Sequence, residues 1–76
     1  MAIKELDTVV LTEDLPSYGL KVGDLGAVVT VYSPEAYEVE FVTGSGKTQA
    51  LLRLSAGKVR PVDSDEILSV RRLTAA

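Results

Sequence analysis

Apolar and polar residues alternate with a period of two through most of this sequence, which limits the chain to short β-strands. The clearest case is Tyr37-Glu38-Val39-Glu40-Phe41, which directs three large apolar side chains to one face and two carboxylates to the other. β-Branched residues dominate a second segment, and they suit a pleated surface better than a helix. The pattern predicts five strands, at residues 7–12, 27–32, 37–41, 49–54 and 59–62.

The segments between these strands are typical of a small barrel. A long loop from Glu13 to Gly26 follows the first strand, short turns join the next three, and residues 55–58 have the length of one 3₁₀ turn. Pro61 lacks an N–H, so the last strand must lie at a sheet edge or end at this residue. We expect an all-β fold, a small five-stranded SH3-like barrel formed by residues 1–62. Three apolar loop residues are expected to close one end of that barrel: Leu20, Val22 and Leu25.

Residues 63–76 follow a different pattern. Asp63 and Glu66 are spaced like a helix-capping box, and Ile67, Val70 and Leu73 recur at helical spacing. A helix of about ten residues is marginal by itself in water. We therefore expect either a short C-terminal helix that packs on an end of the barrel, or a tail that frays until a partner covers its apolar stripe.

The composition excludes most catalytic chemistry. The 76 residues contain no Cys and no His, so thiolate and histidine metal ligands and the commonest general base are missing. The run from Gly44 to Thr48 ends like a phosphate-binding loop, but Phe41 stands where that motif needs its first Gly. We expect no catalytic residue, no metal, no cofactor and no enzyme activity. Because the sequence shows neither a signal peptide nor a membrane-spanning segment, the expected location is the cytoplasm.

The charge of the chain favours a protein partner. There are 8 basic and 11 acidic residues, and the formal net charge of −3 disfavours nucleic acid and suits a basic protein. We expect carboxylates to steer this partner, and the long loop and the tail stripe to contact it. A homo-oligomeric structural protein is an alternative. The candidate partner-binding residues are Glu13, Asp14, Pro16, Tyr18, Glu38, Glu40, Ile67, Val70 and Leu73.

Several segments in the same order resemble a known family of small bacterial and cyanobacterial proteins. They are Ile3 to Leu11, Asp14 to Pro16 with Gly19 to Gly26, and Tyr37 to Phe41, and the closing Val59-Arg60-Pro61-Val62 matches as well. The family is the domain of unknown function numbered 4926, and the resemblance spans residues 2–62. It implies a stand-alone small barrel without an assigned activity.

The resemblance also implies a partner. Members of that family are often encoded beside another small protein, as in a toxin–antitoxin or subunit pair, so the resemblance implies an antitoxin-like or accessory member of a two-protein system. Residues 23–29 are similar to the KOW segments of ribosomal proteins and transcription factors, and this favours a second alternative, a nucleic-acid-binding accessory module. Residues 63–76 lie beyond the usual end of the family, so the resemblance implies nothing about them.

Overall fold

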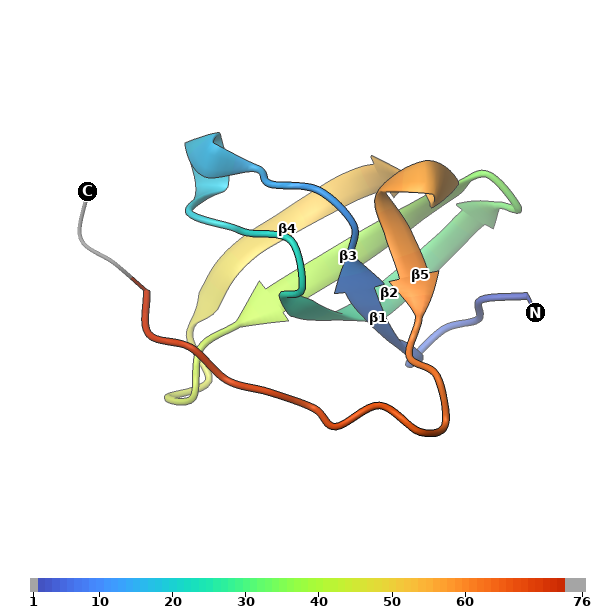
Figure 1. Cartoon of the computed structure of the whole chain (residues 1–76). Coiled ribbons are helices and arrows are strands. Elements are labelled where there is room, and N and C mark those ends of the chain that lie inside the picture. The colour runs from blue at the N-terminus through green and yellow to red at the C-terminus, as the bar shows by residue number, and fades with distance from the viewer. Residues whose placement is uncertain (1, 74–76) are drawn as a thin grey trace.

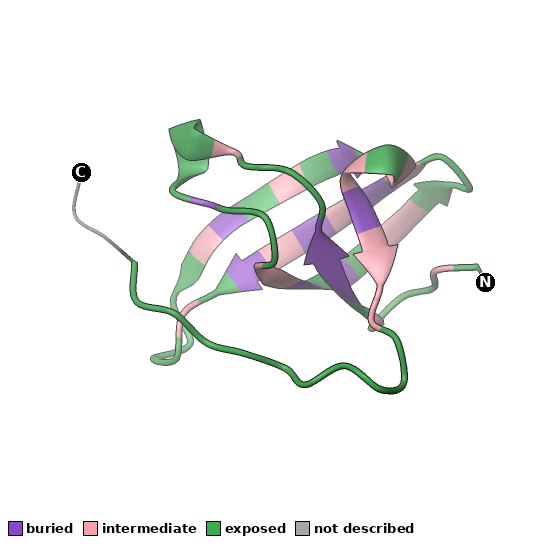
Figure 2. Cartoon of the chain, viewed as in Figure 1, coloured by how far each residue is buried: buried purple, intermediate pink, exposed green. Residues whose placement is uncertain are grey.

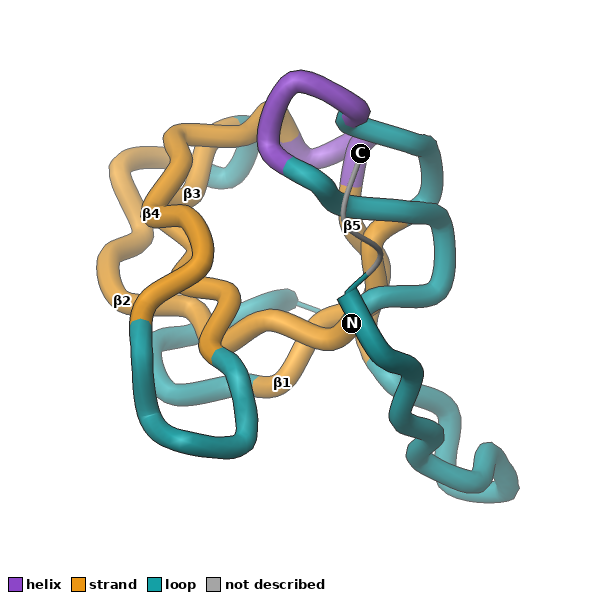
Figure 3. Tube along the Cα trace, turned by 90° about the vertical axis from the view of Figure 1, so that its left-hand side faces the viewer, coloured by secondary structure: helices purple, strands orange, loops and turns teal. Residues whose placement is uncertain are grey.

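Five antiparallel strands form a single sheet that curls around the core (Figures 1 and 3). The computed structural model describes residues 2–73. Two 3₁₀ turns, η1 (Pro16–Tyr18) and η2 (Ala56–Lys58), precede β2 and β5. The predicted five-stranded all-β fold is confirmed. The strands are β1 (Thr8–Leu11), β2 (Leu25–Ser33), β3 (Ala36–Val42), β4 (Thr48–Ser55) and β5 (Val59–Pro61), and they lie in the order β4-β3-β2-β1-β5.

The alternation in the sequence places every second side chain inside the barrel. Val9, Leu11, Val28 and Val39 are fully buried, and Val28 lies opposite Val39 across the β2–β3 pair. Buried positions alternate with less buried ones along β3 (Figure 2). Gly26 belongs to the same inner row, because a Cβ at this position would lie 2.6 Å from Val39 Cγ1. The packing therefore requires Gly where β2 enters the barrel.

The long loop between β1 and β2 contributes one buried side chain to the core, and Leu15 packs against it partly buried. Leu20 is buried there, as expected. For the other two apolar residues the expectation was wrong: Val22 is exposed, and Leu25 lies on the outer face because it pairs with Val10. The cause is a tight turn at residues 21–24, in which the Asp24 carboxylate accepts a backbone N–H at 2.8 Å.

Residues 63–73 form an extended tail, so the alternative of a C-terminal helix is wrong (Figure 1). The first turn does resemble a capping box, because the Asp63 N–H donates to the Glu66 carboxylate at 2.7 Å. However, Arg60 binds both oxygens of that carboxylate at 2.7 Å, and the chain then turns back along the barrel. A short helix gains too little by itself to compete with such contacts. Met1 of the predicted barrel and residues 74–76 of the predicted C-terminal segment lie outside the described residues.

Candidate interaction surface

The outer face of the sheet carries apolar side chains where water would favour polar ones. An antiparallel sheet with one packed face normally presents a polar face to the solvent. Here Val29, Tyr32 and Leu51 are 44%, 47% and 52% exposed. Strand β3 lies between their strands and contributes Glu38 and Glu40. We call the following six residues the outer patch: Val29, Tyr32, Glu38, Glu40, Leu51 and Arg53.

The register of the strands brings the outer patch together. Glu38 of β3 lies opposite Arg53 of β4, and Glu40 lies opposite Leu51. Cross-strand partners point to the same face of a sheet, so these four side chains are neighbours. A bulge in β2 leaves Val29 without a partner on β3 and turns it outward. The expectation that the two carboxylates share a face agrees with this register.

Three side chains of the outer patch hold each other in place. The Tyr32 hydroxyl donates a short hydrogen bond of 2.5 Å to Glu38 Oε1. The guanidinium carbon of Arg53 lies 4.7 Å from the centroid of the Tyr32 ring, within the range of a cation–π interaction. The hydrogen bond to Glu38, which the protonated phenol donates, raises the pKa of Tyr32. Strands β2, β3 and β4 thus present an ordered group of an aromatic ring, a guanidinium and a carboxylate.

Neither carboxylate of the outer patch is neutralised by a direct ion pair within residues 2–73. Glu38 accepts its hydrogen bond from a phenol, and Glu40 accepts one from the Thr48 hydroxyl at 2.7 Å. Both donors are uncharged. With Arg53 included, the outer patch therefore carries a small negative charge beside its apolar side chains, and Glu40 in particular can attract a positively charged group.

The candidate residues of the long loop lie on a separate part of the molecule. Glu13 forms an ion pair with Lys58 of η2, and Asp14 accepts a hydrogen bond of 2.9 Å from a backbone N–H of the same loop. Pro16 and Tyr18 are the first and last residues of η1, and both are exposed. Glu13 and Asp14 therefore stabilise the loop, and the pairing with Lys58 weakens any steering by Glu13. Tyr18 remains available for contact.

The tail is tied to the barrel by two arginine–carboxylate contacts. Beyond the Arg60–Glu66 pair, Arg71 donates two hydrogen bonds to Asp24 and one, at 2.9 Å, to the Gly19 carbonyl. Partial burial raises the pKa of Asp24, but the hydrogen bonds from the Arg71 guanidinium and from a backbone N–H lower it by more. The pKa of Asp24 therefore lies below its usual value. The hydrogen bonds from Arg60 lower the pKa of Glu66 to about 2. The tail thus passes beside Gly19, next to η1.

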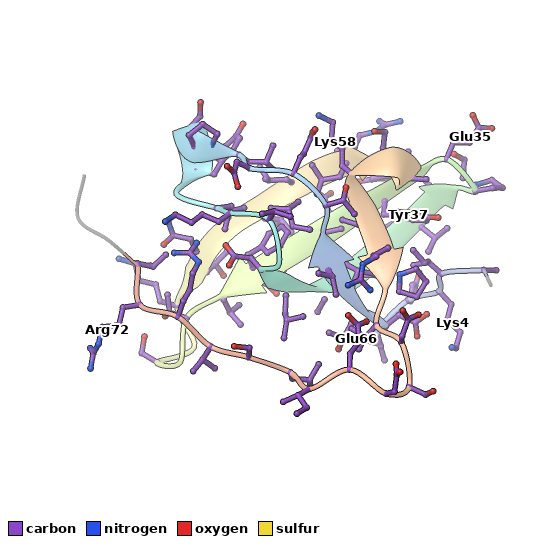
Figure 4. The ribbon with its side chains drawn as sticks, in the orientation of Figure 1. Lys4, Glu35, Tyr37, Lys58, Glu66 and Arg72 are labelled. Carbon is purple, nitrogen blue, oxygen red and sulfur yellow. The ribbon has the colours of Figure 1, made fainter. Side chains whose placement is uncertain are left out.

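The apolar stripe of the tail faces the solvent. Ile67 and Val70 are 93% and 98% exposed, and Leu73 is exposed as well. Figure 4 shows Glu66 below β5 and Arg72 directed away from the barrel. A shallow hollow of about 140 Å³ separates the tail from the outer face of β1. Its lining includes Val10, Leu25, Val62, Glu66, Ile67 and Leu68.

Four members of the outer patch were not among the residues predicted from the sequence: Val29, Tyr32, Leu51 and Arg53. Two sequence features could have indicated Val29 and Leu51. The pairs Val28-Val29 and Leu51-Leu52 place apolar residues on both faces of a strand, although only one face can pack on the core. Tyr32 and Arg53 are 21 positions apart, and only the strand register brings them into contact.

The part of the chain that the structure describes contains no cluster of three or more metal-ligating side chains. No helix within residues 2–73 is both long enough and apolar enough to span a membrane.

A family model matches residues 5–61, which include all five strands. The chain belongs to the family Domain of unknown function (DUF4926). The outer patch lies within the matched residues, whereas the tail follows them. The comparisons with curated proteins and with solved structures gave no match. The membership predicted from the sequence is confirmed, while the likenesses to SH3-like barrels and to KOW segments stay predictions.

Proposed function

We propose that this chain is a non-catalytic protein-interaction module and that the outer patch is its binding surface. The observation that carries the proposal is the ordered, exposed contact between Tyr32 and Arg53 on a sheet face that also exposes Leu51. Tyr and Arg are enriched among the residues that dominate binding energy at protein interfaces. Because these side chains already hold each other, binding would cost less conformational entropy than ordering them anew.

The charge of the outer patch supports a basic partner. Glu38 and Glu40 have no direct ion pair within the described residues, and the whole chain has a formal net charge of −3. Such charges speed association with a positive surface and slow it with nucleic acid, which disfavours the alternative of a nucleic-acid-binding accessory module. We further propose a cytoplasmic role as the antitoxin-like or accessory member of a two-protein system.

Co-expression with the product of the neighbouring gene tests this proposal. We expect the two proteins to elute together from a sizing column at low salt and to separate as salt rises, because screening weakens charge contacts. Tyr32→Ala and Glu40→Gln should weaken the complex. Glu35→Gln is a matched control, since Glu35 lies at the β2–β3 turn and loses the same charge (Figure 4). Separate elution at low salt, or equal effects of Glu40→Gln and Glu35→Gln, would count against the outer patch.

A further inference from the structure

Strand β4 leaves one edge of the sheet open. It is eight residues long and pairs with β3. Within residues 2–73, no backbone hydrogen bond beyond this ladder reaches residues 49–54. Unpaired N–H and C=O groups along such an edge are a template for another strand.

One hydrogen bond fixes which backbone groups of β4 face the open edge. The Ala56 N–H donates to the Glu35 carbonyl at 2.9 Å, one position beyond the pair of Ala36 and Ser55. In an antiparallel ladder, bonded and non-bonded pairs alternate. The β4 residues 50, 52 and 54 therefore exchange hydrogen bonds with β3. The N–H and C=O groups of Leu51 and Arg53 point to the open edge.

The β4 edge lacks the protection that edge strands usually have. Natural edges are blunted by Lys, Pro or a charge that repels a second strand. Residues 49–54 contain neither Lys nor Pro, and their only charge is Arg53. The opposite edge of the sheet differs, because β5 is three residues long and ends at Pro61.

We propose that β4 pairs antiparallel with β4 of a second copy of this chain. To form hydrogen bonds between the two strands, residues whose N–H and C=O groups face the open edge must lie opposite one another. One register that meets this requirement places Arg53 opposite Arg53 of the second copy, and like charges directly opposite are destabilising. A second register, centred on Leu51, places Arg53 opposite Gln49, whose side-chain amide is already held by the Tyr18 carbonyl and has no charge to offset the guanidinium.

The register centred on Leu52 satisfies both the backbone and the charges. It sets Arg53 opposite Leu51 of the second copy, and the partner's Glu40 follows on the next strand because Glu40 lies opposite Leu51. A row across the joined sheet then contains Glu38 and Arg53 of one copy, followed by Leu51 and Glu40 of the other copy. Each Arg53 thus lies opposite an uncharged side chain of the second copy and keeps Glu38 of its own copy as a neighbour, so that no like charges are directly opposed. On the inner side, the partly buried Leu52 meets its own copy.

The dimer would join the two outer faces into one surface. The twofold axis of two antiparallel edge strands is perpendicular to the sheet, so both outer patches lie on the same side. This inference goes beyond the proposed function and does not depend on it, since self-association needs no other protein.

Sedimentation velocity over a concentration series tests the proposal. We expect a mass of twice 8.1 kDa that dissociates on dilution. Arg53→Pro removes an edge-facing N–H while leaving the ladder to β3 intact, so it should be monomeric. Arg53→Ala keeps that N–H and should still dimerise. If Arg53→Pro does not fold, Leu51→Lys decides the outcome, because an added charge at an exposed position blocks edge pairing without disturbing the core.

Amide hydrogen exchange adds a residue-level readout. Protection of the Leu51 and Arg53 amides should rise with protein concentration, whereas protection of the Leu52 amide, already bonded to β3, should change little. A monomer of 8.1 kDa at about 1 mM, the range of the weakest specific complexes, would overturn the proposal. A dimer that persists in folded Arg53→Pro or in Leu51→Lys would overturn it as well.

Discussion

Replacing Gly26 with Ala tests the inner face of the barrel at its tightest point. The added Cβ would lie 2.6 Å from Val39 Cγ1 and 2.9 Å from Phe41 Cε2. Both neighbours are buried, so neither can move into solvent. Inserting a methyl group into a well-packed core costs about 1–3 kcal/mol. For a domain of this size each 1 kcal/mol lowers the Tm by about 4–8 °C, so we expect a decrease of at least ~4 °C.

Thermal unfolding followed by circular dichroism measures this change. Gly44→Ala is the matched control, because Gly44 has no positive φ and its Cβ would meet no atom within 4 Å. The control should leave the Tm unchanged or raise it slightly, since Ala restricts the unfolded chain more than Gly does. Equal Tm values for Gly26→Ala and Gly44→Ala would refute the packing of Gly26 against Val39 and Phe41.

Three further predictions concern the tail and the N-terminal segment. Truncation after Val62 uncovers Val10, and we expect the Tm to fall by several degrees; an unchanged Tm would show that the tail adds no stability. Leu6 has a φ of 73° and is 88% exposed, so Leu6→Asn should raise the Tm by relieving a conformation that Asn tolerates, whereas a decrease would contradict this reasoning. The pKa of Glu66 is lowered from 4.5 to about 2, so its stabilising pair with Arg60 is intact above pH 4.5 and is lost as pH falls through about 2. In an NMR titration with acid, the amide shifts of the tail should change as Glu66 is protonated, and this change should be absent in Glu66→Gln. A change that survives the substitution would show that another group titrates.

The strands could be predicted from the sequence because their alternation is local. Tyr37 to Phe41 alternates as expected, and each of its three large apolar side chains is buried. The tail could not be predicted in the same way, because the pairing of Arg71 with Asp24 joins residues 47 positions apart. Helical spacing alone therefore favoured a helix that does not form.

The outer patch shows the same division between local and distant contacts. That Glu38 and Glu40 share a face follows directly from the strand period, and the sequence indicates it. The exposure of Val29 depends on a bulge, and the contact of Tyr32 with Arg53 depends on the register of three strands. Neither property is encoded by neighbouring residues alone.

The most direct test of the outer patch is an NMR titration of the ¹⁵N-labelled chain with the purified product of the neighbouring gene. Our proposal predicts that amide shifts concentrate on β2, β3 and β4 around Tyr32, Glu38 and Arg53, and that added salt reverses them. Shifts confined to η1 and the tail, or no shifts at concentrations where the two proteins co-elute, would contradict it.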